Sequence, residues 1–306
     1  MVLCLLALPL FAVLGIFSVR YRKLTLDALD CLFKTVTLRK CRSGLDDRIK
    51  ADVTGTILKY SPKTARLVYQ HYKVLSWVVL ILFIWSFYAS SVGVYNYVNY
   101  GNCNGPDSTG FCMLDPTGEN SKIAEVDITI KPNEIIYPKL EDDDPIIGDK
   151  NAELTVIEFG CYACPFTKKA EPTVQEVIDY YRGKVNFQFK TFYIPHHNLS
   201  FEAALAANCA QEQGKYQEYH RILFTYQENL NRELFSELAE NVGLDVDQFN
   251  ECLKTEKYKK EVDSDSLMGV HAGVPGTPTF FVNEQKIVGP KPFKTFKKII
   301  DKELNK

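Results

Sequence analysis

Two cysteines, Cys161 and Cys164, stand three residues apart in the stretch 158–167, which reads EFGCYACPFT. The apolar, β-branched run at 154–159 predicts a strand, and Pro165 favours the first position of a helix, so Cys164 is the predicted N-cap. The free N–H groups and the positive end of the helix dipole favour a thiolate at that position. Because a thiolate is the reactive form of cysteine, this spacing indicates redox chemistry at sulfur.

Two other uses of such a cysteine pair are zinc binding and plain apolar packing. A zinc site needs two further ligands, and the remaining cysteines do not form a second pair at this spacing. The histidines His196 and His197 are adjacent rather than spaced like metal ligands. We therefore expect neither a metal ion nor a cofactor.

A second motif lies downstream in residues 273–282, which read GVPGTPTFFV and pass from a turn into an apolar strand. With this motif, the chain from residue 142 onward resembles the DsbA-like branch of the thioredoxin superfamily. The resemblance implies that Thr277 and Pro278, joined by a cis peptide bond, open a strand that faces the cysteines and binds substrate backbone. Shorter matches are DDDP at 142–145, EP at 171–172, QGKY at 213–216 and YH at 219–220.

The cysteine motif departs from that family. DsbA-like proteins usually carry Cys-Pro-aromatic-Cys, whereas this chain has Thr167 where the second cysteine belongs. Three mechanisms remain open: Cys164 attacks and Cys161 resolves, Cys161 attacks and Cys164 is the buried partner, or Cys164 acts alone beside a hydroxyl donor, Thr167. We favour the first, because helix-terminus electrostatics act on the cap residue and fade within one turn.

Glu158 is a carboxyl group within an apolar strand, where it needs a partner or a proton. The resemblance implies that Glu158 is the buried acid of the family, which tunes the cysteines and relays protons. Lys190, in the neighbouring predicted strand, is the expected counter-charge. The alternative is that Glu158 points outward from an edge strand.

These patterns predict an α/β thioredoxin-like fold with an all-helical insertion, preceded by two transmembrane helices. The first strand, helix and second strand are expected to form a right-handed βαβ unit. The expected elements are a strand at 154–159, a helix at 165–182, a strand at 185–193, helices over 201–270, strands at 279–282 and 286–288, and a closing helix at 292–304. We place the thioredoxin domain at 142–306 and its helical insertion at about 198–270.

Residues 1–19 and 74–98 are uncharged, and each is long enough to cross a hydrocarbon core of ~30 Å, which predicts two transmembrane helices. A cleavable signal peptide is the alternative for the first. The loop at 20–73 carries far more Lys and Arg than Asp and Glu. The positive-inside rule therefore places this loop in the cytoplasm and the rest of the chain outside it.

Residues 99–141 are rich in Gly, Asn, Pro and Asp and predict an extracytoplasmic tether, with one strand where residues alternate at 125–130. Two further pairs of cysteines are candidate structural disulfides in an oxidising compartment. The second pair could equally remain as buried thiols. The pairs are Cys103 with Cys112 in the tether, and Cys209 with Cys252 in the insertion.

The sequence thus predicts a membrane-tethered, extracytoplasmic thiol:disulfide oxidoreductase at the cell membrane. The expected partners are cysteine-containing substrate proteins, a redox recycling partner in the membrane, and the lipid bilayer. Nucleic acid is not expected, because the clustered positive charge is explained by topology. The alternative is a redox-silent, thioredoxin-like substrate-binding or chaperone module on a membrane scaffold. Residue types leave the redox direction open.

Overall fold

The computed structural model describes residues 26, 29–30, 45–125, 135–139, 145–149 and 151–306 of the 306-residue chain. The chain divides into two units, Met1–Ser91 and Val92–Lys306, which are described separately. The first predicted transmembrane helix, at 1–19, lies outside the described residues.

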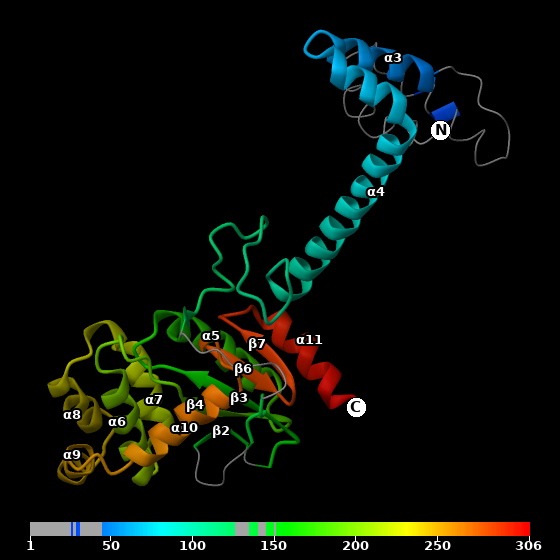
Figure 1. Ribbon diagram of the computed structural model, residues 1–306. Coiled ribbons are helices and arrows are strands. Elements are labelled where there is room, and N and C mark those ends of the chain that lie inside the picture. The colour runs from blue at the N-terminus through cyan, green and yellow to red at the C-terminus, as the bar shows by residue number, and fades with distance from the viewer. Residues whose placement is uncertain (1–25, 27–28, 31–44, 126–134, 140–144, 150) are drawn as a thin grey trace. The chain divides into compact units, whose positions relative to one another are not determined.

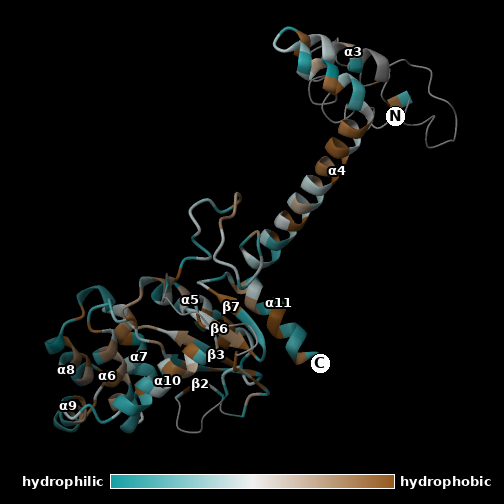
Figure 2. Ribbon diagram, viewed as in Figure 1, coloured by the Kyte–Doolittle hydropathy of each residue, from teal (hydrophilic) through white to brown (hydrophobic). Residues whose placement is uncertain are grey.

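The first unit contains α3 (Leu45–Leu58) and most of α4 (Pro62–Tyr100), whose helical geometry is interrupted at His71. Figure 2 shows a run of hydrophobic residues along α4. Within the described part of the chain, Trp77–Tyr100 is the one helical stretch long and apolar enough to cross a membrane. This stretch overlaps the second transmembrane helix predicted from the sequence. The first predicted helix lies outside the described residues, and two transmembrane helices are therefore not confirmed.

A five-stranded sheet with the order β2-β4-β3-β6-β7 forms the centre of the second unit (Figure 1). Strands β3 and β4 are parallel and joined by α5, as predicted, while β2, β6 and β7 pair antiparallel with their neighbours. This βαβ unit followed by a hairpin is the predicted thioredoxin-like fold. The elements are β2 (Ile146–Gly148), β3 (Leu154–Gly160), α5 (Pro165–Tyr180), β4 (Val185–Thr191), β6 (Thr279–Val282), β7 (Gln285–Val288) and α11 (Phe293–Leu304).

The insertion between β4 and β6 is helical, as the sequence predicts. Helix α6 is buried on all sides because its centre is alanine-rich, and a disulfide joins its Cys209 to Cys252 of α9. The elements of the insertion are α6 (Ser200–Glu212), α7 (Tyr216–Thr225), the 3₁₀ turn η2 (Gln227–Asn229), α8 (Arg232–Asn241), α9 (Val246–Lys254) and α10 (Lys259–His271).

Strand β3 lies between β4 and β6, so the alternative that placed Glu158 at a sheet edge is wrong. Glu158 is level with Phe189 of β4, while Phe159 is level with Lys190. Neighbouring residues of a strand point to opposite faces, so Lys190 lies across the sheet from Glu158. The Lys190 ammonium pairs with Asp265 of α10 at 2.9 Å, and the predicted pairing with Glu158 is therefore wrong.

The segment predicted to be a tether is folded onto the second unit where it is described. A disulfide joins Cys103 to Cys112, and the Val288 N–H donates to the Pro106 carbonyl at 3.0 Å. Further along, β1 (Ala124–Glu125) pairs antiparallel with β5 (Gly276–Thr277). The segment thus reaches from β7 to the chain immediately before Pro278.

Candidate active site

Cys164 occupies the N-cap of α5, as predicted. Its backbone is extended (φ −91°, ψ 119°), and Pro165 begins the helix. The Cys164 N–H donates to the Cys161 carbonyl at 3.0 Å, which closes a turn between the end of β3 and the helix. The Cys164 thiol lies 3.5 Å from the Thr277 carbonyl oxygen, close enough to donate to it. The side chain is fully buried and not disulfide-bonded.

Cys161 follows β3 directly and is also a free, fully buried thiol. Burial raises its pKa to about 12, against partial compensation from neighbouring hydrogen bonds. The Cys161 sulfur lies 3.6 Å from Nδ1 of His197, in the loop after β4. Burial, and then the neighbouring His196, lower the His197 pKa, which favours a neutral imidazole beside this thiol.

Thr167 is buried in the first turn of α5, and its Oγ1 accepts a hydrogen bond from the Cys161 N–H at 3.4 Å. This bond fastens the Cys161 loop to the helix. The hydroxyl that replaces the usual second cysteine therefore positions the cysteine that precedes the helix. Donation from Thr167 to a Cys164 thiolate stays a prediction.

The Thr277–Pro278 peptide bond is cis, and Pro278 leads directly into β6, which pairs with β3. The fold thus brings Cys161, Cys164, Thr167 and Thr277 together at one end of the central strand. Thr277 is fully buried, and its hydroxyl has no hydrogen-bond partner among the described residues.

Glu158 lies beneath this site on the face of β3 that α5 covers. It is 2 % exposed, and its Oε1 has no hydrogen-bond partner within the described residues. Burial raises its pKa well above the ordinary value, and the nearby Glu171 and Cys164 raise it further. Glu158 therefore favours its protonated form, which can give and take a proton inside the fold.

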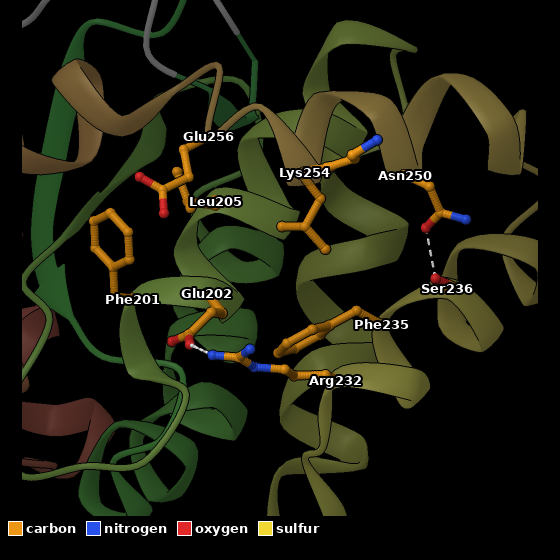
Figure 3. Close-up of a pocket in the computed structure, with 10 residues that line it drawn as sticks. Phe201, Glu202, Leu205, Arg232, Phe235, Ser236, Asn250, Lys254 and Glu256 are labelled. Atoms are coloured by element: carbon orange, nitrogen blue, oxygen red, sulfur yellow. Dashed lines mark hydrogen bonds and ion pairs between the residues drawn. The ribbon is translucent and has the colours of Figure 1, made fainter.

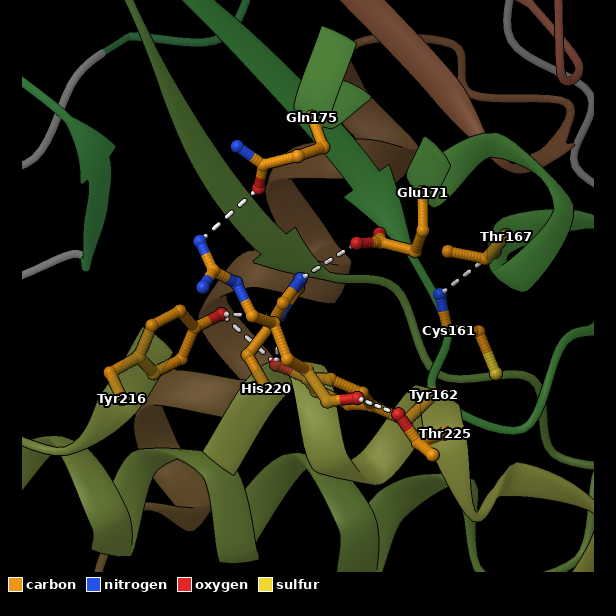
Figure 4. Close-up of polar contacts among 9 residues, drawn as sticks. Cys161, Tyr162, Thr167, Glu171, Gln175, Tyr216, His220 and Thr225 are labelled. Carbon is orange, nitrogen blue, oxygen red and sulfur yellow. Dashed lines mark hydrogen bonds and ion pairs between the residues drawn. The ribbon is translucent and has the colours of Figure 1, made fainter. Parts of the chain in front are cut away.

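A polar cluster beside Glu158 was not assigned from the sequence (Figure 4). His220 Nε2 lies 3.3 Å from a Glu171 carboxylate oxygen, and its Nδ1 lies 3.0 Å from the Tyr162 hydroxyl. The Tyr216 hydroxyl lies 3.0 Å from that of Tyr162. The matches at 171–172, 213–216 and 219–220 contain three of these residues without indicating a role. Glu171 could have been suspected, because it stands four residues after Thr167 on one helix face.

A cavity of about 380 Å³ lies elsewhere, among α6, α8 and α9 (Figure 3). A Glu202–Arg232 ion pair at 3.0 Å and a Ser236–Asn250 hydrogen bond at 2.6 Å line it, and no residue of the cysteine site does. Among the described residues, no group of three or more His, Cys, Asp or Glu side chains is placed to hold a metal.

Comparison with known proteins agrees with this fold. A thioredoxin family model matches residues 140–302. The crystal structure of oxidised BdbD from Bacillus subtilis is 27% identical, with a TM-score of 0.50, and the match covers 56% of this chain and 99% of BdbD. The Na⁺/H⁺ antiporter NhaA 3 of Salinispora tropica is 32% identical over 158 residues, which are 51% of this chain and 24% of the antiporter.

The antiporter NhaA 1 of Mycobacterium sp. (strain KMS) is likewise 32% identical over 159 residues, which are 51% of this chain and 26% of that protein. The chain thus spans about a quarter of the curated relatives that it matches. The family model, in contrast, extends over more than half of the chain and over the β3–α5 cysteine site, the helical insertion and the Thr277–Pro278 segment. The chain therefore belongs to the thioredoxin family.

Proposed function

We propose that this protein is a thiol:disulfide oxidoreductase, in which Cys164 and Cys161 exchange disulfides with cysteines of substrate proteins. The observation that carries the proposal is a pair of free thiols in one buried cluster, with Cys164 at the start of α5 and 3.5 Å from the carbonyl that precedes Pro278. The helix N-terminus stabilises an anion at the cap residue. The cis-Pro segment supplies backbone beside it for an extended substrate.

The two sulfurs have different roles in this proposal. Cys164 is the sulfur that forms the mixed disulfide, because the helix dipole acts on it. Cys161 is the resolving thiol, because its raised pKa keeps it protonated until it is needed. The neutral imidazole of His197, 3.6 Å away, is positioned to accept the Cys161 proton.

The exchange cycle conserves electrons and protons. A substrate thiolate attacks Cys164 of the Cys161–Cys164 disulfide, forming a mixed disulfide and releasing Cys161 as a thiolate that takes up a proton. A second substrate thiolate attacks the substrate sulfur of the mixed disulfide and releases Cys164. The substrate gains one disulfide, and the enzyme gains two electrons and becomes the dithiol. Glu158 relays protons in both directions, and reversal of the steps gives reduction of a substrate.

The proposal places the domain outside the cytoplasm, at a membrane. Trp77–Tyr100 has the length and composition of a membrane span, and the basic loop before it matches the positive-inside rule. Two bonded cysteine pairs, Cys103–Cys112 and Cys209–Cys252, are typical of an oxidising compartment. A membrane redox protein that returns Cys161 and Cys164 to their starting state completes the proposed set of partners.

The test uses the full chain, with Cys161 and Cys164 reduced, in detergent with a peptide substrate whose two cysteines are joined by a disulfide. Cys161→Ser should accumulate a mixed disulfide with the peptide at Cys164, and Cys164→Ser should form none and lose turnover. Cys31→Ser with Cys41→Ser is the control and should exchange like the unmodified protein. A wild-type protein that forms no reversible Cys161–Cys164 bond, and whose double variant keeps its cellular function, would instead support the redox-silent scaffold.

A further inference from the structure

The backbone edge beside the reactive sulfur is already occupied by another part of this chain. In the β1–β5 pairing, Ala124 is level with Thr277 and Glu125 with Gly276. Thr277 is the residue whose carbonyl contacts the Cys164 thiol. Strand β1 therefore lies where an extended substrate would have to pair in order to present a sulfur to Cys164.

The β1 side chains also close the site. Ala124 belongs to the buried apolar cluster that contains Cys161, Cys164 and Ile194, and both cysteines have 0% exposure. Strands β1 and β5 approach so closely that a Cβ on Gly276 would lie 2.1 Å from the Ala124 carbonyl oxygen. A bulky reagent or a protein substrate cannot reach either sulfur while β1 stays in this position.

A folded loop holds β1 from its N-terminal side. The Ser121 hydroxyl accepts a hydrogen bond at 2.7 Å from the amide of Asn102, which precedes the Cys103–Cys112 disulfide. The Lys169 ammonium of α5 donates to the Glu119 carbonyl at 3.1 Å. These contacts keep β1 beside β5 at a high effective concentration. A substrate must therefore displace β1, which belongs to the same chain, before it can pair with β5.

We propose that β1 is an intramolecular occupant of the substrate's backbone site, and that it leaves β5 before a substrate pairs there. The inference rests on the proposed function and narrows its substrate class. The site takes an extended peptide that pairs antiparallel with Gly276–Thr277 and places its reacting cysteine, a side chain only slightly larger than that of Ala124, opposite Thr277. Larger side chains at that position enter only after the neighbouring apolar side chains have moved.

Alkylation of the reduced full chain by a bulky maleimide tests the closure, with peptide mapping to follow Cys161 and Cys164 separately from the other cysteines. Ala124→Gln puts a larger, neutral polar group into the apolar cluster, and Gly276→Ala makes the close backbone approach impossible. Each variant should speed alkylation at Cys164 by tenfold or more. Glu125→Gln, at the exposed neighbouring position, is the matched control and should react like the unmodified protein.

A capture experiment tests the register without requiring an open site. Ala124→Cys in the Cys161→Ser background should form a disulfide with Cys164 under mild oxidation, whereas Glu125→Cys should not, because its side chain is on the exposed side of β1. Unchanged alkylation in both opening variants, or equal capture at positions 124 and 125, would overturn the inference. Neither assay requires turnover, so a protein that passes both and exchanges no disulfides would refute only the proposed function.

Discussion

The substitution Glu158→Gln tests whether Glu158 is protonated in the fold, because the protonation of this buried carboxyl changes how the free energy of unfolding depends on pH. Because burial, Glu171 and Cys164 raise the Glu158 pKa well above 4.5, the native state keeps this proton at a pH where the unfolded chain has lost it. Below pH 4.5 both the native and the unfolded states hold the proton, and Glu158 makes no pH-dependent contribution to the free energy of unfolding. As the pH rises, the native state must keep a proton that the unfolded state releases, so Glu158 destabilises the fold increasingly until its native pKa is passed.

The size of the effect follows from one proton per molecule. Each pH unit above 4.5 costs about 1.4 kcal/mol, so the loss reaches at most about 3.4 kcal/mol at pH 7. A glutamine has nearly the same shape and does not titrate. The free energy of unfolding of Glu158→Gln should therefore rise relative to the unmodified protein by up to that amount between pH 4.5 and pH 7.

Urea unfolding at several pH values, followed by near-UV circular dichroism, measures this difference. Both tryptophans, Trp77 and Trp85, lie in α4, whereas most of the tyrosines lie in the second unit, so the tyrosine bands report mainly on that unit. The control is Glu176→Gln, the same change at an exposed position of α5, which should leave the pH profile unchanged. Profiles for Glu158→Gln and the unmodified protein that run parallel from pH 4.5 to pH 7 would show that Glu158 is ionised in the fold and would refute the reasoning.

Two further predictions concern the cysteines. With the pKa of Cys161 raised to about 12, its alkylation in a Cys164→Ser variant, measured with iodoacetamide and peptide mapping, should speed up about tenfold per pH unit from pH 7 to pH 10; a plateau in that range would contradict the burial argument. Replacing Cys209 and Cys252 by Ala should cost about 4 kcal/mol in urea unfolding, because their disulfide closes a loop with a sequence separation of 43, against about 2.7 kcal/mol for Cys103 and Cys112 at a separation of 9; equal losses would argue against chain entropy as the main cause.

The parts of the fold that could be predicted are those that depend on residues close together in the sequence. The apolar run of β3, the proline at the start of α5 and the short connection between the strands β6 and β7 each act within a few residues, and the structure contains all three. The family resemblance supplied the link between the cysteines and the Thr277–Pro278 segment, which no local pattern contains.

What was missed depends on register and on distant contacts. Lys190 was expected beside Glu158, but the parallel pairing places it level with Phe159 and thus on the opposite face. Strand β1 is two residues long and pairs with a segment far along the chain, so it has too few residues for a periodic pattern. His220 and Glu171 meet only because α7 packs near α5. The spacing of residues in the sequence does not indicate contacts of this kind between distant helices.

The second cysteine of this chain lies before α5, at position 161, instead of at position 167, and this placement explains how the two sulfurs can be chemically unequal. A cysteine at position 167 would lie inside the first turn of α5, close to the same helix end as Cys164. Cys161 instead precedes the helix, where burial raises its pKa to about 12, so about one molecule in 10⁵ carries it as thiolate at pH 7. When the proposed cycle runs toward reduction of a substrate, attack of Cys161 on the mixed disulfide must therefore wait for the removal of the Cys161 proton. In the proposed mechanism the His197 imidazole, 3.6 Å away, accepts that proton and so sets the lifetime of the mixed disulfide.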